Sequence, residues 1–192
     1  METLDKPADV PDSVVAAVER GDPAVFGEIV ATYDLRLRSL TYRLIGADQS
    51  LQDVMQEIYM AVFRGLPGFR GESGVATWIY RVAYTTCLHY LKGQQRQVPV
   101  ADCSEDLSES PDHAPQVVLR LDLATALAAL PVELRAVVLL VDRDGFDYRS
   151  AAAVLGVPVG TIGSRLSSAR ARLRHCLVES TAHGEKGNGR PA

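Results

Sequence analysis

The segment AAAVLGVPVGTIGSRLSSARARLRHCL, residues 151–177, predicts two helices joined by a tight turn. Gly156 and Pro158 mark the turn, because glycine tolerates a positive φ and proline fixes its own backbone angle. Beyond the turn, apolar residues recur at intervals of four, three and four, which is the pattern of a helix that buries one face. These apolar positions are Ile162, Leu166, Ala169 and Leu173.

Residues on both sides of the turn have the spacing of a helix-turn-helix motif. Ala152 is small enough for close helix crossing, Gly156 follows it by four residues, and Ile162 lies six residues further on. The second helix of this motif commonly enters the major groove of DNA. Because the same spacing also occurs in hairpins that bind nothing, the charges on the second helix have to distinguish the two interpretations.

Arginines are the only charged residues between positions 151 and 176. No acidic residue stands between Asp147 and Glu179, so an ion pair one helical turn away cannot neutralise these arginines. We therefore interpret the helix as a DNA-binding face, on which arginines hydrogen-bond base edges or grip phosphates. The alternative is a solvated face on a packed hairpin. The residues concerned are Arg165, Arg170, Arg172 and Arg174, with Ser168 on the same face.

Charge is distributed unevenly along the rest of the chain, whose net charge is −4. Residues 64–97 contain five basic residues and one acidic residue, whereas residues 98–116 contain five acidic residues and no lysine or arginine. The acidic segment also has three prolines, three serines and no apolar period, which predicts a flexible linker. Such segregation points to a nucleic-acid surface on the basic segment.

The composition is that of a globular protein, with 47% hydrophobic and 23% charged residues among 192. This length suits one ordinary domain or two small ones. No apolar run reaches the roughly 18 residues of a membrane span, and residues 1–10 do not resemble a secretion signal, so we expect a cytoplasmic protein without membrane insertion. No nucleophile–base pair, phosphate-binding glycine loop or metal constellation is recognisable. The sequence therefore predicts no enzyme activity, catalytic residue, metal or cofactor.

Helical periodicity extends through most of the chain, and no stretch alternates long enough to predict a strand. The sequence predicts an all-α fold of two small helical domains joined by the acidic linker, with Ser50 and Asp147 as helix caps. The predicted helices cover about 12–20, 22–46, 50–65, 75–94, 117–130, 132–141 and 147–155, and a last one begins at 160. The predicted boundaries are a flexible N-terminus at 1–11, a first domain at 12–97, the linker at 98–116, a second domain at 117–178 and a disordered tail at 179–192.

Aromatic and basic residues alternate along the helix predicted at 75–94. Aromatic rings beside cations suit single-stranded nucleic acid, whose unstacked bases can stack on the rings. The alternative is that the rings belong to the core, which we expect for some of them. The aromatic residues are Trp78, Tyr80, Tyr84 and Tyr90, and the basic ones are Arg81, Lys92 and Arg96.

Three blocks of the sequence together resemble bacterial RNA polymerase sigma factors of the extracytoplasmic-function (ECF) type, a two-domain group within the sigma-70 family. The resemblance implies a sigma subunit that binds core polymerase, recognises −35 and −10 promoter elements in duplex and single-stranded DNA, and promotes promoter melting under the control of an anti-sigma factor. The blocks are DQSLQDVMQEIYMAVFRGLPGFRG at 48–71, ATWIYRVAYTTCLHYL at 76–91 and LAALPVELRAVVLLVDRDGFDYRSAAAVLGVPVGTIGSRLSSARARLR at 127–174.

The resemblance implies a partner for each part of the chain, with the acidic linker threading the polymerase cleft or acting as a plain spacer. Contacts to the β and β′ subunits of core polymerase are implied for Asp53, Gln56, Glu57 and Met60. Melting and single-strand binding at the −10 element are implied for Phe69, Arg70, Trp78, Arg81, Thr85 and Lys92. Recognition of the −35 element is implied for Thr161, Ser164, Arg165, Ser168 and Arg172.

Several of these positions depart from the family pattern, which leaves the promoter preference open. Thr85 stands where Asn is usual, and His89 stands where Asp is usual. Gly163 occupies a place in the last helix where Lys or Arg is common, and Ser168 occupies another such place. Gly163 also lowers helix stability by about 1 kcal/mol relative to Ala.

The residues by themselves are also compatible with two other functions. One is a helix-turn-helix regulator that binds duplex DNA without polymerase. The other is a redox or enzyme-like role for the thiols of Cys87, Cys103 and Cys176. The odd number and wide spacing of these cysteines favour ordinary reduced thiols over a redox switch.

Overall fold

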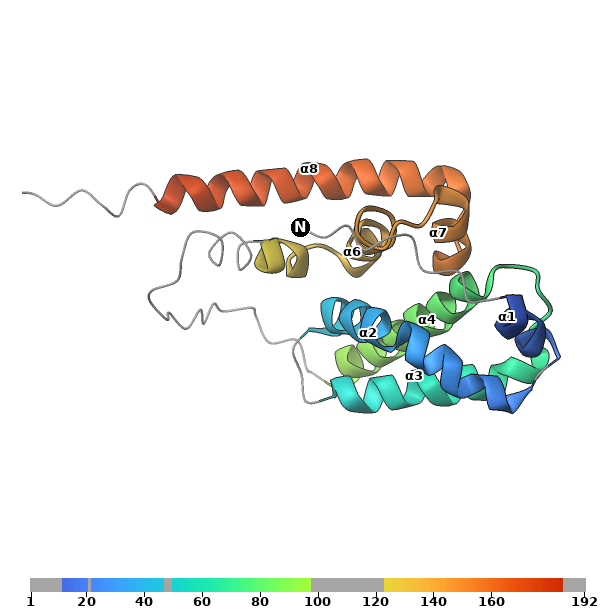
Figure 1. The fold of residues 1–192 in the computed structure, drawn as a ribbon. Helices are drawn as coiled ribbons and strands as arrows, with labels where there is room; N and C mark the ends of the chain where they lie inside the picture. Colours follow the sequence, from blue (N-terminus) through green and yellow to red (C-terminus); the bar gives the residue numbers. More distant parts are fainter. Residues whose placement is uncertain (1–11, 21, 47–49, 98–122, 185–192) are drawn as a thin grey trace, which may run out of the picture.

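The computed structural model describes residues 12–20, 22–46, 50–97 and 123–184, and every regular element in these ranges is helical (Figure 1). The N-terminus at 1–11 and the linker predicted at 98–116 lie outside the described residues. The first module, within residues 12–97, contains α1 (Asp12–Glu19), the 3-10 turn η1 (Pro23–Val25), α2 (Phe26–Ile45), α3 (Leu51–Gly65), the 3-10 turn η2 (Leu66–Gly68) and α4 (Val75–Gln97). The second module, residues 123–184, contains a helical stretch at 123–128, α6 (Val132–Val138), the π-helical turn η3 (Leu139–Arg143), α7 (Tyr148–Leu155) and α8 (Val159–Gly184).

The apolar stripes predicted on α2 and α3 form the core of the first module. Asp22 directly precedes η1, and its carboxylate accepts a hydrogen bond from the Ala24 N–H at 2.9 Å. Along both helices the apolar side chains recur every three or four residues, so each helix turns one face toward the other. The buried residues are Ile29, Tyr33, Leu37, Leu40 and Leu44 on α2, and Val54, Met55, Ile58 and Val62 on α3.

Ser50 precedes α3 but does not cap it through its side chain, so that prediction is wrong. The side chain makes no capping hydrogen bond. Its hydroxyl instead lies 2.5 Å from the hydroxyl of Tyr90 on α4. Ser50 therefore joins the start of α3 to α4, while its carbonyl accepts the helical hydrogen bond of Val54 at 2.9 Å.

The second module has the helix-turn-helix geometry predicted from the sequence. Asp147 caps α7, because its carboxylate accepts a hydrogen bond from the Ser150 N–H at 2.8 Å. Gly156 ends α7 in the left-handed region at φ 66°, and Ala152 and Ile162 are both buried. In Figure 1, α8 lies across α6 and α7. The stripe that holds it there is buried at Ile162, Leu166 and Ala169 and half-buried at Leu173.

Two helix boundaries in the second module differ from the prediction. The predicted helix at 132–141 ends its α-helical part at Val138, and a wider π turn follows, closed by a 2.9 Å hydrogen bond from the Asp144 N–H to the Leu139 carbonyl. The disordered tail was predicted from 179, but α8 continues to Gly184. The helix continues because residues 164–183 contain neither glycine nor proline to end it.

The two modules pack against each other, which the sequence did not predict. Figure 1 shows α6 and α7 above α2 and α4. Tyr80 on α4 and Phe146, just before α7, are both buried and meet edge to face with ring centroids 4.8 Å apart. The chain thus has a shared interface in addition to its two cores.

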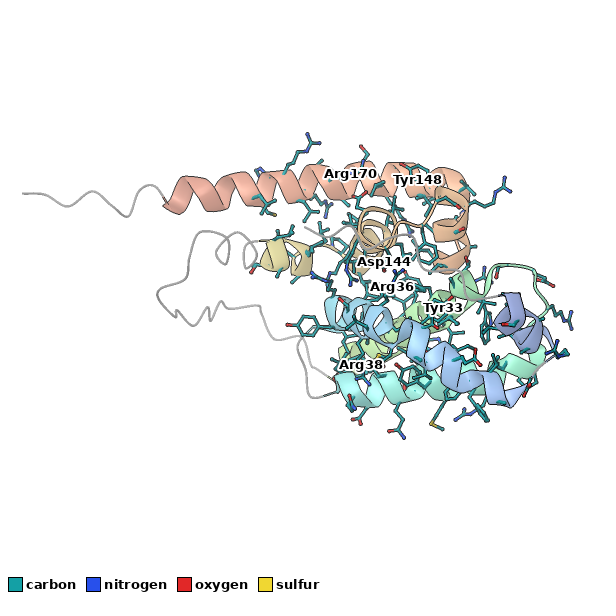
Figure 2. The ribbon with its side chains drawn as sticks, in the orientation of Figure 1. Tyr33, Arg36, Arg38, Asp144, Tyr148 and Arg170 are labelled. Carbon is teal, nitrogen blue, oxygen red and sulfur yellow. The ribbon has the colours of Figure 1, made fainter. Side chains whose placement is uncertain are left out.

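Asp144 is a fully buried carboxylate at this interface, with 0% of the residue exposed. The Nη1 atom of Arg143 lies 3.5 Å from Asp144 Oδ1, and Arg36 of α2 lies nearby between the modules (Figure 2). Burial raises the pKa of Asp144 to about 6, although the charges of Arg143, Arg36 and Arg43 oppose that rise. Asp144 is therefore more easily accommodated when it is protonated.

Replacing Asp144 with Asn is expected to remove one component of the pH dependence of folding. A raised pKa in the folded chain gives a stability contribution that is present below about pH 4 and lost as the pH rises through about 6. The free energy of unfolding of the parent chain should therefore fall by up to about 3 kcal/mol, relative to D144N, between pH 4 and 7. Urea titrations at each pH measure this difference, and parallel profiles for the two proteins would contradict it.

Candidate nucleic-acid and protein interfaces

An exposed groove runs along α3, the helix for which polymerase contacts are expected. It has a volume of about 460 Å³. Gln56 and Met60 line it, and Met60 is 44% exposed. Asp53 and Glu57 are exposed on the same helix but lie outside the lining. The full lining of this groove, which we call the α3 groove, is Phe26, Arg38, Gln52, Met55, Gln56, Tyr59, Met60, Phe63 and Arg64.

Polar contacts between α2 and α3 fix the shape of the α3 groove. The Nε of Arg38 donates to both carboxylate oxygens of Asp34, at 2.8 and 3.0 Å, and its Nη1 donates to Gln52 at 2.9 Å. The Tyr59 hydroxyl donates to the same Asp34 carboxylate. Because Asp34 accepts from both helices, the groove walls are held in register before any partner binds.

Aromatic residues that the sequence analysis did not assign to this site form much of its surface. Phe63 is 48% exposed, and its ring meets that of Phe26 edge to face at 5.3 Å. Phe26 also contacts Tyr59, with centroids 6.5 Å apart. A signal was present, because Phe63 follows Met60 by three residues and therefore shares its helix face.

A second, polar groove lies where the loop after η2 meets the start of α4. It has a volume of about 510 Å³ and is lined by Gly68, Phe69, Arg70, Glu72, Ser73, Trp78, Arg81 and Ala153. We call it the loop groove. Phe69 is buried beneath it, with its ring centroid 5.3 Å from that of Trp78, while Arg70 is exposed. Four of the six residues predicted for single-strand binding therefore meet here.

Gly65 at the end of α3 is required for the position of the Trp78 ring. A Cβ atom at residue 65 would lie 2.8 Å from the ring, which is closer than carbon atoms approach each other. The half-buried Trp78 therefore packs directly on the backbone of α3 and keeps one side toward the loop groove.

The remaining residues predicted for single-strand binding, Thr85 and Lys92, lie further along α4. Both are exposed, and their spacing from Trp78 places them on the same helix face. In contrast, Tyr80 and Tyr84 are buried, so the core interpretation is correct for these two rings. The half-buried Tyr90 bonds to Ser50, so it too has a structural partner.

On α8, the residues predicted to contact duplex DNA differ in their exposure. Ser164, Ser168 and Arg172 recur every four residues on one exposed face. Thr161 is half-buried, and its carbonyl accepts a hydrogen bond from the Ser164 hydroxyl at 3.0 Å. Arg165 is half-buried, and its charge opposes the rise in the pKa of Tyr84 that burial causes.

Arg170 is not the unpaired cation that the arginine-only pattern indicated. Its Nε and Nη2 atoms donate to the two carboxylate oxygens of Asp142 at 3.0 and 2.5 Å. The partner comes from η3, 28 residues earlier in the chain, so no acidic residue within α8 itself indicates the pair. Arg172, in contrast, is exposed on the other side of the helix.

Gly163 lies beside the ring of Tyr148. An added Cβ at residue 163 would lie 3.7 Å from a ring carbon of Tyr148, so the first residue of α7 packs over this part of α8. Figure 2 shows Tyr148 beside α8, close to Arg170. At this distance a Cβ atom makes an ordinary van der Waals contact, so an alanine would fit at position 163.

Cys87 is disfavoured as a reactive thiol because it is buried. Burial raises the pKa of this thiol to about 11, and its Sγ lies 3.9 Å from Thr41 Oγ1, so it is protonated at neutral pH. Cys176 is half-buried, and Cys103 lies outside the described residues. Over the described ranges, no three His, Cys, Asp or Glu side chains gather as metal ligands would. No helix in these ranges has both the length and the apolar character to cross a membrane.

Comparisons with known proteins agree with the geometry. Two family models match, Sigma-70 region 2 over residues 29–97 and Sigma-70, region 4 over residues 120–173. The chain is 31% identical over 170 residues to the ECF RNA polymerase sigma-E factor of Escherichia coli (strain K12), covering 82% of this chain and 88% of that protein. It is 32% identical over 177 residues to the RNA polymerase sigma-H factor of Pseudomonas aeruginosa, covering 85% and 92%.

A solved structure also shares the fold. The sigma factor RpoE from Bartonella quintana, in complex with the anti-sigma factor NepR, matches with a TM-score of 0.64. The sequences are 23% identical, and the match covers 79% of this chain and 96% of that one. The likeness extends across both helical modules.

Proposed function

Because the chain belongs to the ECF family of RNA polymerase sigma factors, we propose that it binds core polymerase through α3, reads a −35 element with α8 and opens DNA at a −10 element with the loop groove and α4. The observation that carries this assignment is the presence of three exposed surfaces of different chemistry on one chain. The α3 groove is largely apolar, the loop groove has two cations beside a tryptophan, and α8 presents serines and an arginine.

The α3 groove suits a helical partner on the polymerase. An apolar channel bordered by polar side chains is the surface on which an amphipathic helix docks. We assign its polar border to Asp53, Gln56 and Glu57 and its apolar centre to Met60, which together would contact the β and β′ subunits. Aromatic rings in such a groove contribute most of the affinity, because they bury large areas at low entropic cost.

Melting without ATP requires binding energy for the separated strand. Stacking a base on an aromatic ring is worth about 1–3 kcal/mol, which is comparable to the cost of unpairing that base. Trp78 offers the ring, and Arg70, Arg81 and Lys92 offer charge for the phosphates. Phe69 supports the tryptophan from below, and Thr85 would make a weaker base contact than the Asn usual in the family.

On α8, we assign contacts with the upstream element to Thr161, Ser164, Arg165, Ser168 and Arg172. The three exposed members of this set face the same way, as residues that enter one groove must. Arg165 is half-buried, whereas Arg172 is exposed, so Arg172 is the more accessible of the two arginines.

Replacing Arg172 with Ala should weaken promoter binding without affecting polymerase binding. Losing one arginine contact costs about 1–3 kcal/mol, so holoenzyme affinity for the upstream element should drop about 5- to 150-fold. Footprinting of the holoenzyme measures this loss, and co-elution with core enzyme tests the second part. Arg20→Ala, an exposed arginine of the first module, is the control, and equal upstream protection by R172A and R20A would reject the assignment.

We also propose that an anti-sigma factor controls this chain, as NepR binds the RpoE protein named above. Such a partner would cover the polymerase-binding and DNA-binding surfaces together. Purification of the tagged chain from cells in which it is inactive should yield one stoichiometric protein that blocks core enzyme binding. A freely polymerase-competent chain under those conditions would contradict the proposal.

Transcription by a reconstituted holoenzyme tests the function as a whole. At salt concentrations like those of the cytoplasm, core polymerase with this chain should start transcripts at defined sites on genomic DNA. Core polymerase alone should not. A conventional regulator would instead bind duplex DNA by itself and start nothing. If transcription is retained after the accessible cysteines are alkylated, a thiol-based role is also rejected. We assign no catalytic activity to the chain.

A further inference from the structure

The arginines of α8 differ in what they already bond. Arg170 is held by Asp142 through two hydrogen bonds, so it supports the fold of the second module. Arg165 is half-buried, whereas Arg172 and Arg174 are exposed. Among the described residues no carboxylate forms an ion pair with either of these two, and Arg174 Nε donates only a long hydrogen bond, 3.4 Å, to the Arg170 carbonyl. Two cations of this helix are therefore available to a polyanion.

Helical geometry places these two arginines on opposite flanks of α8. The buried apolar stripe faces the rest of the second module, and Ser164 lies almost opposite that stripe. At about 100° per residue, Arg172 and Arg174 lie roughly 80° to either side of the direction of Ser164. The row formed by Ser164, Ser168 and Arg172 therefore winds from the outward side of the helix onto one flank, and Arg174 stands on the other.

Between the two flanks, the exposed residues in the first four turns of α8 carry no charge. A serine hydroxyl can donate or accept, so it discriminates base pairs less sharply than an arginine that bonds both acceptors of guanine. The Ser164 hydroxyl already donates to the Thr161 carbonyl at 3.0 Å, so its oxygen serves as an acceptor for the amino group of adenine or cytosine. The exposed residues are Gly160, Ser164, Ser167, Ser168 and Ala171.

The dimensions of the major groove give the flanks and the outward side different partners. The groove is about 12 Å wide, and an α-helix with its side chains is about 10–12 Å across, so the helix fills it. Its outward side then meets base edges, while its flanks meet the phosphates that border the groove. Arg172 and Arg174 lie about 20 Å beyond the start of α8, where recognition helices of other folds also contact the backbone.

We propose that Arg172 and Arg174 grip phosphates on the two sides of the major groove, and that Ser164 and Ser168 make the base contacts between them. The inference rests on the function proposed above, and it adds Arg174 to the residues that bind the upstream element. It predicts that affinity for this element is mainly electrostatic and that its base preference is broad.

The salt dependence of holoenzyme binding to a fluorescein-labelled promoter duplex tests the phosphate contacts. Each phosphate contact adds about 0.9 to the slope of log affinity against log salt, so the ratio of parent to Arg174→Gln affinity should fall about 3.5-fold between about 50 and 200 mM salt. Arg172→Gln should behave in the same way. R172K and R174K keep the charge and should keep the parent's slope, as should the control Arg20→Gln in the first module. Circular dichroism checks that each variant is folded. A parent-like slope for R174Q would overturn the inference.

Base preference is measured by sequencing the duplexes that each holoenzyme selects from a pool with a randomised upstream element. R172Q and R174Q should select the same bases as the parent, because a phosphate contact carries no sequence information. Ser164→Ala should instead lose a preference for adenine or cytosine at one position and keep the parent's salt slope. Relaxed preference in R172Q would show that Arg172 reads a base, and unchanged preference in S164A would reject the serine contact; either result contradicts the inference.

Binding by the parent chain separates this inference from the function on which it rests. A parent chain that gives core polymerase no binding to the upstream element would reject the proposed function and the inference together. A parent holoenzyme that binds, with R172Q and R174Q both at the parent's salt slope, would reject only the phosphate contacts.

Discussion

Changing Phe63 to Asp is expected to weaken association with core RNA polymerase by about 100-fold, the equivalent of roughly 2.7 kcal/mol. The ring is 48% exposed and lies in the α3 groove against Phe26, where a partner helix would bury it. A carboxylate there would have to be desolvated without a cation provided for it. Fluorescence anisotropy of the labelled chain titrated with core enzyme measures the change.

Tyr42→Asp is the matched control for this experiment. Tyr42 is an aromatic residue of α2 with nearly the same exposure, 49%, but it does not line the α3 groove. Its replacement should leave polymerase affinity within about twofold, since exposed substitutions away from an interface have small effects. Equal losses for the two variants would mean that the groove is not the docking site. No loss for F63D would have the same meaning.

Changing Trp78 to Ala is expected to slow promoter opening by about 5- to 150-fold, corresponding to the loss of one base stack worth about 1–3 kcal/mol. Polymerase binding should remain, because Trp78 lies outside the α3 groove. Trp78→Phe keeps an aromatic face and should recover much of the rate. Open-complex formation on duplex promoters, followed by stopped-flow fluorescence, distinguishes the three proteins.

A template that is already unpaired at the −10 element separates melting from general damage. If Trp78 supplies energy for strand separation, W78A should initiate on the unpaired template nearly as well as the parent chain. Equal defects on duplex and unpaired templates would instead indicate that the ring only supports the fold around Gly65 and Phe69.

Features of the fold that depend on neighbouring residues were predictable from the sequence. Asp147 caps α7, Gly156 adopts its positive φ and Ile162 is buried, because each follows from local backbone chemistry and helical period. The exposure of Met60 also followed, since it lies off the apolar stripe of α3. The prediction that the Ser50 side chain caps α3 failed because the hydroxyl of Tyr90, on another helix, was available as a competing partner.

Contacts between distant residues were not predictable in this way. Arg135 and Arg43 are 92 positions apart, and a guanidinium bonded to backbone carbonyls leaves no pattern in the partner's side chains. Asp142 could not be identified as the partner of Arg170 without knowing that η3 packs beside α8. Only part of the α3 groove was predicted, for a similar reason. Phe26 comes from α2, and its place beside Phe63 depends on helix packing.

These differences matter for function because the interface residues lie beside the DNA-binding ones. Arg81 was predicted as a DNA contact, and it is exposed as expected, but it also bonds to α7. A sequence comparison identifies such residues as part of a binding face, whereas their availability depends on how the modules are arranged.

Permanganate footprinting measures strand opening by the chain and polymerase together most directly. The promoter for this experiment is chosen by sequencing transcripts started on genomic DNA. Unpaired thymines at the −10 element should become reactive only when this chain and core polymerase are both present. Reactivity with the chain alone would contradict the requirement for polymerase, and an unreactive complete mixture would contradict the assignment of strand opening to this protein.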